Sequence, residues 1–393
     1  MKRSFLMLLA FGLFPINLLA WTNGELLLWM DNERGRSLQP IANKFESDLG
    51  LKVTIETPEK ITDSFPIAAQ AGKGPDLVIW AHDKVGEWAD GGLISPVNVQ
   101  KQFVEKFFAK SWQAVMHRDQ LWGYPLALET ATLIYNKALL DGPPPRELSQ
   151  LASIDQAMKR NHPGVITILW DARSAYYTWA ILASGGGFVF ARNGSDYDLK
   201  NIGIATPGAV DALSEIIGLI RSGILPKVCP YSETEERMGQ GKLAMMISGP
   251  WAWSNLTQKG INFGLGQIPG VEGKVGRPFV GVSVAYINRS SPNQDVAKEF
   301  IEHYLLTDEG LAAMDKAKPI GVPALISLYE KLAKDNPHLR QLKASVDIGQ
   351  IMPNVPQMGR FFSSLGAALQ LAADGRLSAD AALRQAEANI RHE

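Results

Sequence analysis

The sequence is poor in the groups that most enzymes and metalloproteins use. It has one cysteine, Cys229, which excludes an intramolecular disulfide, a CxxC redox pair and a Cys-based zinc cluster. The six histidines are scattered, without the spacing of a metal site. Near-matches to a phosphate-binding loop, a dinucleotide fingerprint and a nucleophile elbow each lack a required residue. We therefore expect no catalytic residue, no cofactor and no metal site.

The chain also lacks a block of charge of one sign. Lys and Arg total 39 against 40 Asp and Glu, which gives a formal net charge of -1. Nucleic acids and anionic membranes require a concentrated basic face, so neither is expected as a partner. With 393 residues, 46% of them apolar, the chain is long enough for two or three domains.

Long hydrophobic runs are absent except at the N-terminus. A basic start, Met1-Lys2-Arg3, precedes an almost wholly apolar run over residues 5–14, and Ala20 ends the segment. These are the regions of a secretory signal peptide, and the run is too short for a membrane-spanning helix. Trp21 stands where a lipoprotein needs a cysteine. We expect cleavage of residues 1–20 and an exported, unanchored protein.

Short apolar segments alternate with longer amphipathic ones along the rest of the chain. Helical patterns cover 38–49 and 378–391, the second with Ser378 placed as its cap. The patterns of strands cover 26–30, 53–55, 77–80, 131–135, 165–169, 244–247 and 282–287. This alternation predicts an α/β fold with mostly parallel sheets. No Gly/Ser-rich linker divides the chain, so two domains would share several chain crossings.

Aromatic and charged side chains gather where these predicted strands end. They include Glu33, Arg34, Trp80, Asp83, Lys84, Glu129 and Trp251. Open α/β sheets bind ligands at the carboxyl ends of their strands. Flat rings that cover the faces of a sugar, with charged groups that bind its hydroxyls, are what a sugar site requires. The pattern therefore favours carbohydrate binding.

Seven motifs follow one another in order along the chain after residue 20. They are GPD (74–76), WAHD (80–83), IYNK (134–137), GPWAWSN (249–255), PFVGV (278–282), LLTDEGL (305–311) and IMPN with PQM (351–354, 356–358). In these motifs the chain resembles the periplasmic maltose/maltodextrin-binding proteins of ABC importers.

The resemblance implies a two-lobed periplasmic binding protein fold with a three-crossing hinge and a cleft between the lobes. One lobe would comprise 21–127 with 285–335, and the other 132–280 with 337–393. The hinge would lie near 128–130, 281–284 and 335–337. It further implies a monomer that closes on maltose or a maltodextrin and delivers it to membrane permease subunits.

Matched position by position, the resemblance implies stacking of the sugar on Trp80 and Trp251. It implies polar contacts from Asp83, Glu129 and Tyr176, and an apolar contact from Met352. Other positions depart from the family pattern. Glu33-Arg34 replaces Asp-Lys, Lys84 replaces Arg, Phe362 replaces a platform Trp, Ser174 replaces Glu and Gly366 replaces Arg.

These departures leave the ligand open between a maltodextrin and another oligosaccharide, cyclic or differently linked. Two other functions also remain as alternatives. A periplasmic glycoside hydrolase would need two of the carboxylates Glu33, Asp83 and Glu129, one with a raised pKa. We expect Arg34 and Lys84 to hold these carboxylates ionised, which favours a binding protein over an enzyme. Ferric binding through the phenolates of Tyr176 and Tyr177 is the third hypothesis.

Overall fold

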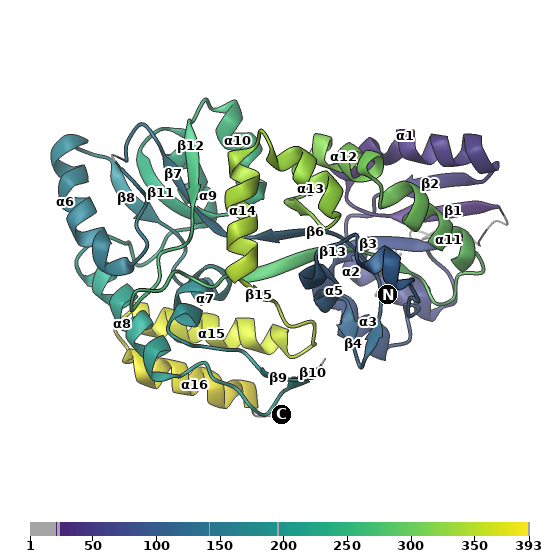
Figure 1. Cartoon of the computed structure of the whole chain (residues 1–393). Helices are drawn as coiled ribbons and strands as arrows, with labels where there is room; N and C mark the ends of the chain where they lie inside the picture. The colour runs from purple at the N-terminus through teal and green to yellow at the C-terminus, as the bar shows by residue number, and fades with distance from the viewer. Residues whose placement is uncertain (1–20, 22–23, 141, 195, 392–393) are drawn as a thin grey trace, which may run out of the picture.

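The computed structural model describes residues 21, 24–140, 142–194 and 196–391. The predicted signal peptide lies outside these residues. Two sheets with helices packed on them form two lobes, which lie side by side in Figure 1. Across the described ranges, no helix is long and apolar enough to cross a membrane.

The first lobe is built on a mixed sheet in the order β14-β6-β13-β3-β1-β2, with β15 beside β13. Its strands are β1 (Glu25–Trp29), β2 (Lys52–Glu56), β3 (Leu77–Ala81), β6 (Tyr124–Thr130), β13 (Phe279–Ile287), β14 (Val322–Pro323) and β15 (Gln350–Ile351). Its helices are α1 (Asn32–Leu49), α2 (Ile61–Gln70), α3 (Val85–Asp90), α4 (Lys101–Val104), α5 (Ala109–Ala114), α11 (Gln294–Phe300), α12 (Asp308–Ala317) and α13 (Ile326–Ala333). A π-helical turn, Ile301–Leu305, extends α11.

The second lobe is built on a four-stranded sheet in the order β12-β7-β11-β8. Its strands are β7 (Thr132–Asn136), β8 (Ile166–Leu169), β11 (Leu243–Ser248) and β12 (Phe263–Gly266). The helices packed around it are α6 (Leu151–Asn161), α7 (Ala175–Ser184), α8 (Pro207–Arg221), α9 (Tyr231–Gly239), α10 (Trp253–Gln258), α15 (Met358–Ala373) and α16 (Ala379–Arg391). Two small hairpins, β4 (Met116–His117) with β5 (Gln120–Leu121) and β9 (Ala191–Asn193) with β10 (Asp196–Asp198), lie outside the main sheets.

The sheets are mixed, so the prediction of mostly parallel sheets was wrong. β1 runs parallel to β2 and β3, but β13 runs antiparallel to β3 and β6. In the second sheet β8 is parallel to β11, while β7 is antiparallel to both of its neighbours. Antiparallel pairing follows from the crossings, since β6 leaves the first sheet and β13 returns to it from the second lobe.

The first helix starts earlier than its apolar pattern predicted. α1 begins at Asn32, whereas the pattern placed its start at residue 38. The Asp31 side chain accepts a hydrogen bond from the Arg34 N–H at 3.0 Å, which caps the first turn. Gly50, at φ 70°, ends the helix in a left-handed conformation. The predicted cap of the last helix is confirmed, because Ser378 Oγ accepts from the Ala381 N–H at 3.2 Å.

The chain passes between the lobes three times. A single residue, Ala131, separates β6 from β7, and the loop after β12 leads back into β13. The third passage is α14 (Pro337–Ile348), which contacts β6 of the first sheet and β12 of the second. Glu129 and Gly281, both in the proposed hinge, face each other across the β6–β13 pair. The exact hinge and lobe boundaries stay a prediction.

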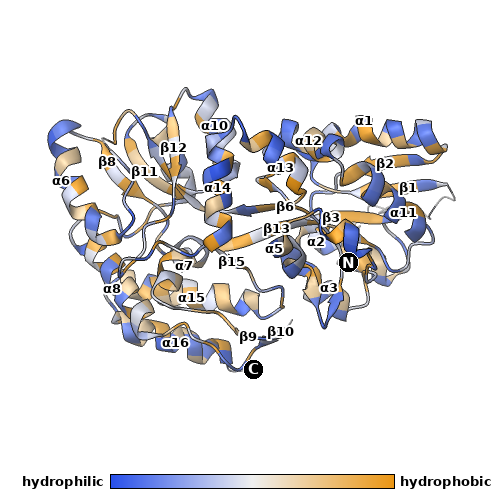
Figure 2. Cartoon of the chain, viewed as in Figure 1, coloured by the Kyte–Doolittle hydropathy of each residue, from blue (hydrophilic) through white to orange (hydrophobic). Residues whose placement is uncertain are grey.

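Buried apolar side chains hold the strands in both lobes. Orange colour runs along β3 and β13 in Figure 2, while the outer face of α1 carries blue segments. Strand β13 contributes to both apolar cores, with Val282 in one and Phe279 in the other. Strand β13 is therefore packed against an apolar core in each lobe. It holds the ends of the neighbouring strands β3 and β6 in place.

A buried histidine ties three segments together beneath these strand ends. The Val282 N–H donates to His82 Nδ1 at 3.0 Å, and His82 Nε2 lies 2.8 Å from the Met352 carbonyl oxygen. Since Nδ1 accepts, Nε2 carries the proton and donates to Met352. Burial lowers the pKa of His82 to about 4. The neutral ring therefore connects β3, β13 and the segment after β15 at neutral pH.

Candidate sugar-binding site

A pocket of about 360 Å³ lies at the carboxyl ends of β1 and β3, bounded by β6 and β13. Of the predicted site residues, Glu33, Arg34, Trp80 and Glu129 line it. Parallel strands bring their carboxyl ends to one edge of a sheet, so residues distant in sequence meet there. The indole of Trp80 is partly exposed, as a platform for a ligand requires.

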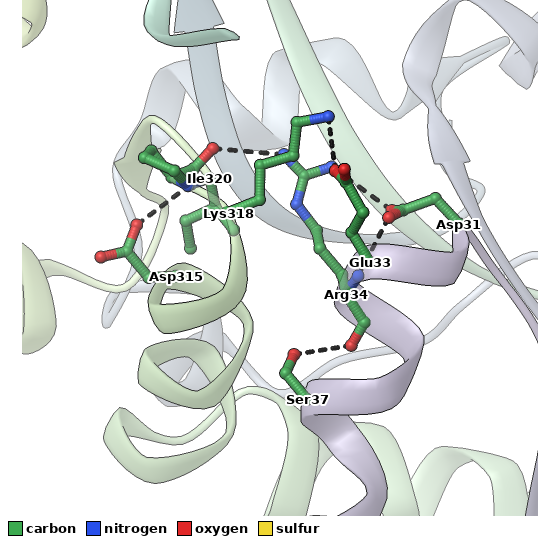
Figure 3. Close-up of polar contacts among 8 residues, drawn as sticks. Asp31, Glu33, Arg34, Ser37, Asp315, Lys318 and Ile320 are labelled. Atoms are coloured by element: carbon green, nitrogen blue, oxygen red, sulfur yellow. Dashed lines mark hydrogen bonds and ion pairs between the residues drawn. The ribbon is translucent and has the colours of Figure 1, made fainter. Parts of the chain in front are cut away.

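The mouth of the pocket holds a cluster of charges between α1 and the connection from α12 to β14 (Figure 3). Glu33 pairs with Lys318 at 2.7 Å, as Figure 3 shows. One terminal nitrogen of Arg34 lies 3.4 Å from Asp31 Oδ2, and the other donates to the Pro319 carbonyl at 3.2 Å. Both terminal nitrogens of Arg34 are therefore held by neighbouring groups at the pocket wall.

The sequence did not reveal Lys318, although it lines the pocket beside Glu33. It lies between α12 and β14 in a segment without a strand or helix pattern. The turn that presents it is fixed by Asp315, whose Oδ1 accepts from the Ile320 N–H at 3.0 Å. Only the fold brings this turn to α1, so no local signal could have identified it.

Burial dominates the electrostatics of Glu129. It raises the pKa of this carboxyl group, while Arg34 and Lys318 lower it by a smaller amount. The cations act on Glu129 in the expected direction, but burial outweighs them, so the net shift of its pKa is upward. A desolvated carboxylate lacks the water that would otherwise bind it, so hydroxyl donors from a ligand stabilise its charged form.

Asp83 and Lys84 lie on a short turn of 3₁₀ helix that follows β3 directly. Asp83 Oδ1 is buried and finds no hydrogen-bond partner among the described residues. Burial raises the pKa of Asp83, and Lys84 opposes this effect. Lys84 donates instead to Glu87 at 2.8 Å. The structure therefore turns Lys84 toward α3 and leaves Asp83 with an unsatisfied oxygen.

The second lobe contributes a strip of aromatic rings. Trp251 follows β11 and Tyr176 begins α7 after β8, and their ring centroids are 6.3 Å apart. Phe279 lies 6.5 Å from Tyr176 and 6.1 Å from Phe362, so the strip runs from Trp251 to Phe362. Met352 is half-buried against the same apolar core. Phe279 itself is 1% exposed, so the partly exposed rings of Trp251, Tyr176 and Phe362 are the ones that offer flat surfaces for the C–H faces of a sugar chain.

Glu129 is the residue that connects the pocket with this strip. Its charge contributes to a raised pKa of Tyr176, for which burial is the larger cause. The next residue, Thr130, donates from its Oγ1 to the Phe279 carbonyl oxygen at 2.7 Å, which joins the end of β6 to the aromatic strip. The predicted residues thus form two groups, the pocket residues and the aromatic strip, while Asp83 and Lys84 lie outside the pocket lining.

The Tyr176–Tyr177 pair belongs to the aromatic strip, and their ring centroids lie 5.3 Å apart. Burial raises the pKa of Tyr177 to about 12, and it raises the pKa of Tyr176 as well. Ferric binding by this pair stays a hypothesis. The Tyr177 ring stacks on Tyr231 with centroids 6.1 Å apart, beside Trp251. Sequence reasoning missed Tyr231 as a neighbour of the aromatic strip.

A charged pair lies next to two of the positions that depart from the family pattern. Asp171 Oδ1 accepts from the Arg173 N–H at 3.1 Å and lies 3.7 Å from Arg173 Nε. Ser174 follows directly and makes no side-chain cap bond at the start of α7. A Cβ atom at Gly366 would lie 3.6 Å from the Arg173 carbonyl oxygen. The Asp171 carboxylate and the Arg173 guanidinium therefore lie close to positions 174 and 366.

Comparison with known proteins identifies the family. A family model described as bacterial extracellular solute-binding protein matches residues 31–311, which is more than half of the chain. The chain belongs to this family. The family has the two-lobed periplasmic binding protein fold, which agrees with the two sheets and three passages described above. Its description also places its members outside the cytoplasm.

Three relatives cover most of the chain at low identity. A galactooligosaccharide-binding protein of Bacillus subtilis is 28% identical, over 92% of this chain and 87% of its own. A maltotriose-binding protein of Pyrococcus abyssi is 25% identical, over 88% and 77%. A maltooligosaccharide ABC transporter solute-binding lipoprotein of Streptococcus pneumoniae is 25% identical, over 85% and 80%. All three are named as binding proteins, and none as an enzyme.

Proposed function

We propose that this protein is the exported, periplasmic solute-binding component of an ABC sugar importer. It captures a maltose or maltodextrin molecule by closing its two lobes and delivers the sugar to membrane permease subunits. The observation that carries the proposal is the junction at the end of β6, where Glu129 lines the pocket and the next residue, Thr130, donates to Phe279 of the aromatic strip. A pocket with Trp80 and several charges lies on one side, and the Trp251–Tyr176 strip lies on the other.

The chemistry of both groups suits an uncharged polyhydroxyl ligand. Desolvated carboxylates at Asp83 and Glu129 accept hydrogen bonds from hydroxyl groups, and the cations Arg34 and Lys318 donate hydrogen bonds to hydroxyl oxygens. Aromatic faces cover the C–H surfaces of the rings. Because ligand contacts from both lobes are complete only when the lobes approach, binding shifts the population toward the closed form.

The relatives support an oligosaccharide but differ in its type. Two bind maltotriose or maltooligosaccharides by name, and one binds galactooligosaccharides. The maltodextrin assignment therefore rests on the motifs and on the aromatic strip. Ser174, Phe362 and Gly366 are the positions at which another sugar, cyclic or differently linked, gains an advantage.

A glycoside hydrolase is the competing function, and one observation favours it. The raised pKa values of Asp83 and Glu129 resemble those of catalytic acids. Incubation with maltotriose distinguishes the two functions. We expect intact maltotriose after prolonged incubation, and release of glucose in proportion to protein concentration would overturn the carrier function.

The proposal is tested by titrating tryptophan fluorescence with maltose, maltotriose, a cyclodextrin, trehalose and glucose. We expect saturable binding of maltose or maltotriose. Trp251→Ala should weaken it at least about tenfold, or ~1.4 kcal/mol. Trp122→Phe is the matched control, since Trp122 lies outside the pocket lining and its Nε1 donates to the His117 carbonyl. Saturation by another sugar alone would reassign the ligand, and saturation by none would overturn the proposal.

A further inference from the structure

A second pocket, of about 420 Å³, shares no lining residue with the one described above. Its walls come from α5 of the first lobe, from the segment leading into β9 of the second lobe and from β15 between them. None of the predicted site residues lines it. The sugar-binding function therefore leaves this pocket without a role.

The lining of this pocket is positively charged. Lys110, Arg192 and Arg277 line it, and none of its described lining residues is Asp or Glu. The whole chain has nearly equal numbers of acidic and basic residues. The separation of charge is therefore local and does not follow from composition. A concave wall with one sign of charge concentrates ions of the opposite sign.

The side chain of Lys110, on α5, is held against the C-terminal end of α14. Its Nζ donates to the carbonyl oxygens of Val346, Asp347 and Gly349 at 2.7, 2.7 and 2.9 Å. These carbonyls form the negative end of the helix, which holds an ammonium group favourably. The charge is thereby positioned at the pocket wall without a full counter-charge.

The two arginines are also held in place. With the Gln350 amide oxygen turned toward Arg277, it accepts from both terminal nitrogens at 3.2 and 3.1 Å. The Arg192 guanidinium lies 5.2 Å from the centre of the Tyr197 ring. A guanidinium that is already oriented loses little entropy when it binds an oxyanion through its planar fork.

The cations repel one another across the pocket. Burial lowers the pKa of Lys110 most, Asp347 opposes this, and the nearby charges of Lys343 and Arg277 lower the pKa further. Asp347 already pairs with Lys343 at 2.7 Å, so it neutralises only part of the cluster. An anion inside the pocket relieves this repulsion.

We propose that this pocket binds a small multivalent oxyanion of the phosphate class, held mainly by Arg277 and Arg192. Lys110 adds its charge, and the Gln113 amide at the wall adds a further polar group. Because the walls come from both lobes, a bound anion stabilises one placement of the lobes. Phosphate and sugar then change each other's affinity by the same factor. This link rests on the proposed function, whereas the anion site does not.

The site is tested by thermal unfolding and calorimetric titration with inorganic phosphate, against sodium chloride at matched ionic strength. We expect a saturable rise in Tm with phosphate only. Arg277→Gln should weaken phosphate binding at least about tenfold. Arg384→Gln removes the same charge from an exposed arginine paired with Asp380, and should leave binding unchanged. No saturable effect beyond chloride, or equal binding by Arg277→Gln, would overturn the site.

Sugar titrations of the same proteins separate the two proposals. Normal sugar binding by Arg277→Gln shows that the variant is folded. For the wild type, we expect sugar affinity to differ between buffers with and without saturating phosphate. Equal affinity in both buffers would remove the link between the pockets. Phosphate binding without binding of any sugar would contradict the proposed function while supporting the anion site.

Discussion

Glu129 lies on β6, at the point where the chain leaves the first lobe, and its carboxyl group is desolvated. Its pKa is raised above the ordinary value of 4.5, chiefly by burial. The folded protein therefore binds this proton more tightly than the unfolded chain does. Stability therefore falls as the pH rises above the unfolded pKa, until the folded carboxyl group has also lost its proton.

Replacing this carboxylate with an amide should stabilise the fold and weaken sugar binding. We predict that apo Glu129→Gln has a higher Tm than the wild type at pH 7 and the same Tm at pH 4. Its sugar affinity should fall by about 1.5–3 kcal/mol, since a charged hydrogen bond is lost. Thermal unfolding at both pH values, with a sugar titration at pH 7, measures this. A lower Tm at pH 7 would show that the ionised carboxylate stabilises the fold.

At the scale of elements, the N-terminus of α1 has both a structural and a binding role. Asp31 caps the helix, and Glu33 and Arg34 in its first turn line the pocket. The sequence pattern placed the helix start too late, because Pro40 and the charged first turn hide the apolar period. The cap is formed by residues that are close in sequence. Whether the first turn of α1 lines a pocket depends on how the helix packs against the sheet.

Loss of this cap should weaken the fold measurably. We predict that Asp31→Ala lowers the free energy of unfolding by about 0.5–2 kcal/mol in urea denaturation. Asp31→Asn is the control, because asparagine caps helices about as well while removing the charge. If both variants lose equal stability, the charge of Asp31, which lies 3.4 Å from Arg34, matters more than the cap.

At the scale of the whole molecule, three passages of the chain join the lobes, and one of them is the single residue Ala131. Few backbone angles therefore need to change for the lobes to rotate. The shift of the population toward the closed form is limited by how much better that form binds the sugar. The proposed sugar contacts come from both lobes, which provides this difference.

Closure should be visible in solution. We predict that saturating maltotriose, or the sugar that binds in the titration, reduces the radius of gyration measured by small-angle X-ray scattering. Trp251→Ala at the same sugar concentration should keep the larger value, because it lacks a main contact. An unchanged radius for the wild type with saturating sugar would mean that binding occurs without lobe rotation.

The sequence alone determined the family and the two-lobed α/β fold, and it predicted the strand ends at which the site is proposed. Buried strands carry strong apolar patterns, so segments such as 77–80 and 282–287 were predicted within β3 and β13. The motifs around Trp80 and Trp251 are local, and each lies at the carboxyl end of a strand of its own sheet, β3 and β11. The binding roles of these residues remain predictions.

Tertiary structure alone decided the pairing directions and the electrostatics. Antiparallel β13 depends on where the chain returns between lobes, which apolar patterns do not encode. Lys318 reaches Glu33 only through the packing of α12 beside α1. The sequence suggested that Arg34 lowers the pKa of nearby carboxylates, but burial outweighs it at Glu129. Burial is a property of the whole fold, because it depends on segments far apart in the sequence.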